Sequence, residues 1–165
     1  KPKVTNGAGQ STYDSGSNDV TFATLDFDTT TQEYAHTLPI GMPKSWNEST
    51  VTFAATWSHA ATVTNFGVAL ALAGVAISND DAGDVAFGTA VIAGAAGTGD
   101  TGGTTDDIYV TPTSAAITIA GTPAAEDWVM FQVNRTVSDS ADTMTIDARL
   151  HGITLYITTD AANDS

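Results

Sequence analysis

The chain has 165 residues, of which 42% are hydrophobic, and this is enough for one domain with a two-layer core. Its 19 acidic and five basic residues give a net charge of −14, which argues against nucleic acids and anionic membranes as partners. Cysteine is absent, which excludes disulfides and thiolate metal sites, and we expect no signal peptide and no membrane insertion.

Residues 1–19 are polar and rich in Gly, Ser and Asn, and they contain two of the five basic residues, Lys1 and Lys3. This composition predicts an extended N-terminal arm without a core of its own. The two lysines in an otherwise acidic chain favour docking to an acidic neighbour, so we expect Lys1 and Lys3 to attach the protein to its partner. An arm that stays disordered is the alternative.

The next segments read as strands separated by turns. Residues 20–27 and 33–38 are short β-type runs, and a Pro-containing turn then leads to Trp46. Residues 50–59 alternate most clearly, with Val51, Phe53 and Trp57 on one face and Thr and Ser residues on the other. This alternation predicts a strand with one buried face, and Trp57 therefore belongs to the core.

Residues 66–77 are apolar on both faces, which predicts a strand covered on both sides; a helix is the competing interpretation. One face carries Phe66, Val68, Leu70 and Leu72. We expect the small-residue face to meet another subunit or a long loop, and we take it as a candidate oligomer interface, formed by Ala69, Ala71, Ala73 and Val75.

Further strands are predicted at residues 106–110, 115–119, 128–137 and 145–158. In the last of these the apolar residues change phase at His151 and Gly152, which indicates a β-bulge. Together the strands predict an all-β protein, a jelly-roll-like antiparallel β-sandwich over residues 20–159 with a polar tail at 160–165.

Few residues suit chemistry. The three histidines, His36, His59 and His151, lack ligand spacing and are expected at a surface or an interface. Pairs of aspartates could hydrolyse a glycosidic bond, but Asp is common in turns, so no catalytic residue and no required cofactor is assigned. Two other candidate sites remain: calcium at Asp80, Asp81 and Asp84, and stacking of a glycan on Trp46 and Trp128.

Several segments carry a resemblance: residues 50–57, 74–90, 108–112, 119–125, 131–135 and 142–153. They include Gly74-Val-Ala-Ile, Ile108-Tyr-Val-Thr-Pro, Phe131-Gln-Val-Asn-Arg and Arg149-Leu-His-Gly-Ile. In these motifs the chain resembles structural proteins of tailed bacteriophages over about two thirds of its length.

The resemblance implies a non-enzymatic virion component on the head or tail, such as a decoration, spike or fibre. It also implies a homotrimer that contacts capsid or tail proteins and the host surface. Two alternatives from other classes stay open: a carbohydrate-binding module, and a polysaccharide-degrading enzyme.

Overall fold

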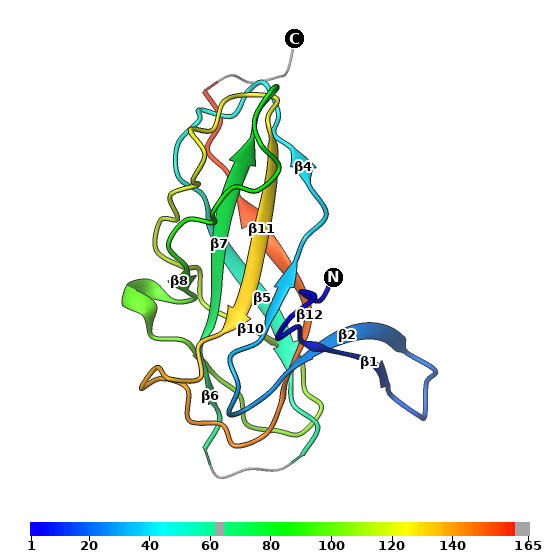
Figure 1. The fold of residues 1–165 in the computed structure, drawn as a ribbon. Helices are drawn as coiled ribbons and strands as arrows, with labels where there is room; N and C mark the ends of the chain where they lie inside the picture. Colours follow the sequence, from blue (N-terminus) through cyan, green and yellow to red (C-terminus); the bar gives the residue numbers. More distant parts are fainter. Residues whose placement is uncertain (62–64, 161–165) are drawn as a thin grey trace.

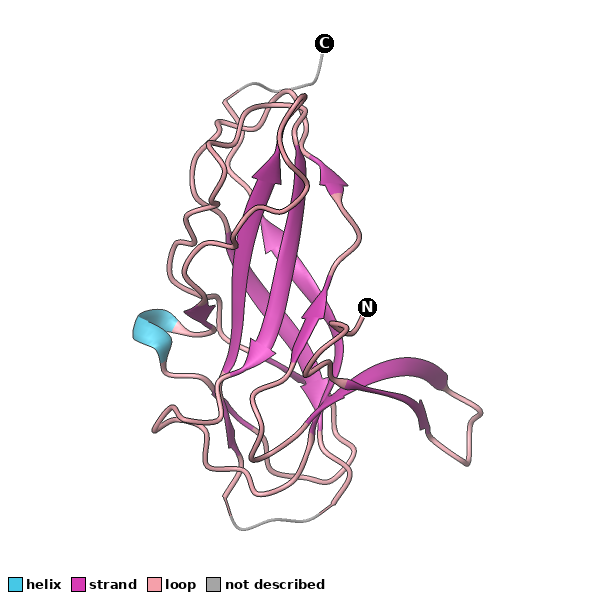
Figure 2. Cartoon of the chain, viewed as in Figure 1, coloured by secondary structure: helices cyan, strands magenta, loops and turns pink. Residues whose placement is uncertain are grey.

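The protein is an all-β sandwich of two antiparallel sheets (Figures 1 and 2). A computed structural model describes residues 1–61 and 65–160. The strands are β1 (Gly9–Asp14), β2 (Thr21–Phe27), β3 (Tyr34–His36), β4 (Ile40–Gly41), β5 (Thr52–Ser58), β6 (Gly67–Val68), β7 (Leu70–Ile77), β8 (Val91–Ile92), β9 (Asp100–Thr101), β10 (Tyr109–Val110), β11 (Trp128–Arg135) and β12 (Ala148–Tyr156), with a single 3-10 turn, η1 (Ala95–Gly97). The predicted all-β class and the antiparallel β-sandwich are thus confirmed. No helix in the described part of the chain is long and apolar enough to cross a membrane.

The first sheet has the strand order β1-β2-β12-β5-β10, and the second has the order β3-β11-β7-β8. Alternation places one face of each strand in the shared core, as the pattern of β5 predicts. Phe53 and Trp57 enter the core from the first sheet, and Leu72 and Phe131 enter it from the second. Residues 115–119, predicted as a strand, instead make one isolated bridge, between Ile117 and Val51, the residue before β5. The next residue, Ala120, bridges to Val75 of β7.

The N-terminal residues are attached to both sheets. Residues 1–8 run along β3, where the backbone nitrogens of Lys3 and Ala8 donate to the carbonyl of Tyr34 at 3.1 and 3.2 Å. Residues 9–14 form β1, which pairs with β2 over its whole length. The predicted arm is therefore a strap on β3 followed by an edge strand, and it is not separate from the sandwich. The predicted tail lies, beyond Asp160, outside the described residues.

The small-residue face of β7 is covered by the chain itself. Ala69, Ala71, Ala73 and Val75 are each at most 3% exposed in the single chain. The segment between β7 and β8 crosses this outer face (Figure 1) and brings the ring of Phe87 onto that of His36, with 5.3 Å between centroids. Of the two expected covers, a long loop is the one observed. The assignment of these four residues to an oligomer interface is corrected, since their side chains are already buried.

The bulge in β12 is confirmed. Leu150 lies opposite Trp57 of β5 and Gly152 lies opposite Thr56, so His151 is the additional residue. Gly152 itself shows no positive φ, and an added Cβ would meet no atom within 4 Å. The bulge therefore does not require glycine at position 152. Glycine is common in bulges because it tolerates a positive φ, and that reason does not apply here.

Candidate functional site: a cleft on the open side of the sandwich

The bulge marks the point where two neighbouring strands of the first sheet separate. β2 pairs with β12 only from Phe27 opposite Ala148 to Leu25 opposite Leu150. Beyond Leu150, β12 continues to Tyr156 beside β5, whereas β2 leaves with β1 as a hairpin that projects from the body (Figure 1). The separation opens a gap on the side of the sandwich where β3 and its strap face β12.

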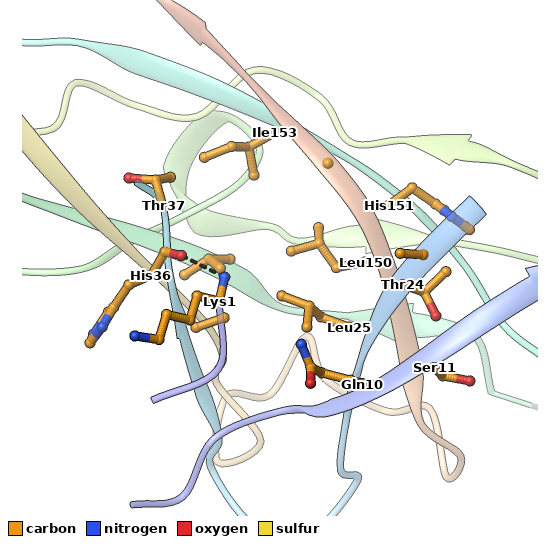
Figure 3. Close-up of a pocket in the computed structure, with 14 residues that line it drawn as sticks. Lys1, Gln10, Ser11, Thr24, Leu25, His36, Thr37, Leu150, His151 and Ile153 are labelled. Carbon is orange, nitrogen blue, oxygen red and sulfur yellow. Dashed lines mark hydrogen bonds between the residues drawn. The ribbon is translucent and has the colours of Figure 1, made fainter. Parts of the chain in front are cut away.

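This gap is an apolar cleft with a volume of about 290 Å³. Figure 3 shows Leu25, Leu150 and Ile153 on the side of their strands that faces Lys1. Ala35 and Val133 add apolar surface from the second sheet. The volume is near the lower end of the range for small-molecule sites, so the cleft suits a few apolar side chains or a small apolar group.

The rim of the cleft is positively charged on the strap side. The backbone nitrogen of Lys1 donates to the carbonyl of His36 at 2.8 Å, and the Lys3 ammonium lies 4.7 Å from the centre of the Tyr34 ring. Burial lowers the pKa of His36, and the charges of Lys3 and Lys1 lower it further. An anionic group is therefore favoured at this rim.

The opposite rim carries His151, whose ring belongs to an aromatic cluster with residues outside the cleft lining. The Nε2 atom of His151 lies 2.8 Å from the Ser58 hydroxyl, and its ring packs edge-on against Phe22, which stacks on Tyr13. Burial is the main cause that lowers the pKa of His151, and Arg149 acts in the same direction. Protonation of His151 is therefore disfavoured relative to that of an exposed histidine.

The two tryptophans proposed to stack on glycans have different environments. Trp46 is 1% exposed and belongs to the core, so it cannot serve as a glycan platform and that assignment is corrected. Trp128 is 64% exposed and lines a groove of about 370 Å³ with Asn79, Glu126 and Asp127. The Asp127 carboxylate accepts hydrogen bonds from the Ser78 hydroxyl and the Ala124 amide, both at 2.8 Å.

The three candidate calcium ligands do not form a site. Asp81 accepts from the backbone nitrogen of Ser78 at 2.9 Å, and Asp80 accepts from the Asn79 side chain at 2.8 Å, so both shape a turn. Nowhere in residues 1–61 and 65–160 do three His, Asp or Glu side chains, Asp84 included, gather as a metal site would require.

Other acids serve the scaffold. Asp26 and Asp106 flank Arg149 at 3.8 and 3.3 Å. Asp28 accepts from the backbone nitrogens of Thr30 and Thr31, which lower its pKa. The pairs that suggested glycoside hydrolysis are therefore engaged in ion pairs and turns.

Sequence reasoning missed the cleft. The phase change at His151 located the bulge, but nothing in the sequence shows that β2 leaves β12 at that point. Comparisons with protein-family models, with curated proteins and with solved structures find no match for this chain. The fold and the site define an antiparallel β-sandwich with a projecting hairpin and an apolar cleft on its open side.

Proposed function

We propose that the chain is a non-enzymatic structural protein of a tailed-phage virion, displayed on the head or tail and assembled in the host cytoplasm. The observation that carries the proposal is the arrangement of its N-terminal residues. They place a hairpin outside the body of the sandwich and two exposed lysines beside it, in a chain of net charge −14. Projecting hairpins and separated charges suit docking to neighbouring subunits.

The residues that carry the phage resemblance support the same proposal, because they build the scaffold. Arg135 and Asp142, from two of the matching segments, form a buried ion pair. Gly121, from a third, has a φ of +83° and lies against the backbone of Ala76, where a Cβ would collide. Such motifs preserve a rigid framework and contribute no reactive group.

Immunogold labelling of purified particles tests the proposal. Antibody against this chain is expected to label intact virions of the phage that encodes it at one defined location. Labelling of infected cells without labelling of purified particles would contradict the proposal. Particles of a phage whose genome lacks the gene provide the control for antibody specificity.

A second candidate function, glycan binding at the host surface, is favoured by Trp128. An exposed indole beside Asn79, Glu126 and Asp127 combines a stacking surface with hydrogen-bonding groups, which is how sugar rings are held. The matched control is Trp57→Phe, because Trp57 is fully buried and does not line the groove.

Binding to an array of host-surface glycans, followed by titration, tests this second function. Trp128→Ala is expected to abolish binding, whereas Trp57→Phe is expected to retain it. Equal binding by the wild type and Trp128→Ala would contradict the role of the groove.

A further inference from the structure

The sandwich lacks a strand on its open side. Over residues 151–156, β12 pairs with β5 on one edge, and no strand or bridge in the described part of the chain pairs with its other edge. Its sequence there, His-Gly-Ile-Thr-Leu-Tyr, contains no charged residue and no proline. Edge strands of monomeric proteins are normally protected by such residues.

Apolar residues at the same opening are left without cover. Leu38 is 78% exposed, and Ile40 and Ile157 are each 37% exposed. Ile40 lies opposite Val129, a core residue, so it belongs to the core-facing side of the second sheet. The cleft itself adds apolar surface from Leu25, Leu150 and Ile153. An extended segment that pairs with β12 would cover them.

The chain itself has an extended element free to dock. The β1–β2 hairpin is well formed to its tip, where Ser15 donates to the carbonyl of Val20 at 3.0 Å and accepts from its amide at 3.1 Å. It nevertheless projects away from the body of its own sandwich (Figure 1). Val20 at the tip is half exposed. Phe22 and Tyr13, near the base of the tip, contact the His151 ring of the same chain, so only the tip itself, with Val20, projects from the sandwich.

Charge selects the partner of this hairpin. Its tip carries Asp14 and Asp19, both exposed, while the strap beside the cleft carries Lys1 and Lys3, also exposed. Of the three remaining basic residues, Arg135 is buried against Asp142, and Arg149 is engaged by Asp26 and Asp106. Lys44 is exposed in the segment after β4 and does not line the cleft. Two copies of a chain with net charge −14 repel each other over most of their surfaces, but the hairpin tip and the strap attract.

We infer that the hairpin of one copy docks into the open side of a second copy. There it lies along the free edge of β12, with Val20 over the apolar cleft and its two aspartates beside Lys1 and Lys3. This is strand addition, in which backbone hydrogen bonds supply affinity and a pocket supplies specificity. The contact joins different surfaces of the two copies, so its repetition gives a ring where the rotation between copies closes and a filament where it does not. A closed ring of three copies rests on the proposed function.

Charge reversal tests the inference with the full chain. Sedimentation equilibrium over a micromolar concentration series is expected to show self-association of the wild type. Asp14→Lys with Asp19→Lys is expected to weaken association about tenfold, and so is Lys1→Glu with Lys3→Glu. All four changes together restore opposite charges at the contact and are expected to return the affinity to within about threefold of the wild type.

The matched control is Asp80→Lys with Asp84→Lys. It changes the net charge by the same amount, at exposed residues far from the hairpin in sequence, and each pair contains one aspartate with positive φ, Asp80 or Asp19. Its effect on affinity is expected to stay within about twofold, since long-range charge effects are screened. A control as disruptive as the hairpin variant would overturn the inference, as would the absence of rescue in the fourfold variant.

Hydrogen exchange measures whether the free edge of β12 becomes paired, which a general change in surface charge would not cause. In the associated protein, the amides of residues 151–156 are expected to exchange more slowly than in the dilute monomer. Protection elsewhere without protection of this edge would overturn the inference. A wild-type monomer that nevertheless labels on virions would also overturn it while leaving the proposed function intact. A protein that self-associates in this way but is absent from virions would contradict the proposed function and leave the inference intact.

Discussion

At the scale of single residues, the most heavily engaged side chain is Arg135. It is fully buried, and its guanidinium donates to both oxygens of Asp142 at 2.8 and 2.9 Å. It also donates to the carbonyls of Ile146, Met144 and Phe27, so its donors are all used. Arg135 thereby fixes the connection between β11 and β12, because one cation donates to a buried carboxylate and to three carbonyls.

Replacing Arg135 by Met is expected to destabilise the fold by about 3–5 kcal/mol, because the Asp142 carboxylate would then lack its buried partner. Urea unfolding followed by circular dichroism measures the change. Arg149→Met is the control, since its ion pairs are partly solvated and are expected to contribute less than about 1 kcal/mol. Equal losses of unfolding free energy in the two variants would contradict the larger contribution expected from the buried ion pair.

The two histidines with lowered pKa values make stability depend on pH. In the unfolded chain both have a pKa near the ordinary value of 6.5, whereas in the folded chain partial burial lowers the pKa of each. The unfolded state therefore binds more protons between the two pKa values, so the free energy of unfolding falls as the pH drops below 6.5.

We expect this decline between pH 7 and pH 5, and a weaker one in the double variant His36→Gln with His151→Gln. Urea unfolding at a series of pH values provides the measurement. If the free energy of unfolding of the double variant falls with pH as steeply as that of the wild type, groups other than these two histidines cause the pH dependence.

At the scale of elements, the strands with clear apolar runs could be predicted from sequence, including the short β3 and β10, but β1, β4, β8 and β9 could not. β5, β7, β11 and β12 follow their predicted segments because each buries an apolar face. β1 was missed because its residues, Gly-Gln-Ser-Thr-Tyr-Asp, have almost no apolar face, and backbone pairing with β2 holds it in place. The cleft was missed for a related reason, since strand separation depends on pairing and not on composition.

Two glycines give a prediction at this scale. Gly121 has a positive φ, and a side chain there would collide with the carbonyl oxygen of Ala76, whereas Gly152 lies in open space. Gly121→Ala is therefore expected to cost at least about 1–3 kcal/mol, and Gly152→Ala is expected to stay within about 0.5 kcal/mol of the wild type. Thermal unfolding of both variants measures this. A large loss at Gly152 would mean that its backbone conformation is strained.

At the scale of the whole molecule, the dominant physical property is charge. The chain has 19 acidic residues and five basic ones, so its negative side chains repel one another in the folded state. Two of the basic residues, Arg135 and Arg149, are engaged in the ion pairs described above. Salt screens such repulsion, because the screening length falls from about 30 Å at 0.01 M to about 3 Å at 1 M.

We therefore expect the melting temperature to rise as sodium chloride is added from low concentration. Differential scanning calorimetry measures it, with sucrose of equal osmolality as the control for solvent effects. A melting temperature that falls with salt would mean that attractive ion pairs outweigh the excess of negative charge.

The claim that this chain is an assembled virion component is tested most directly by its copy number in purified particles. Quantitative mass spectrometry against an isotope-labelled standard gives that number relative to the major capsid protein. The account predicts a fixed copy number that is a multiple of three and does not change with further purification. A trace amount that declines at each purification step would contradict it.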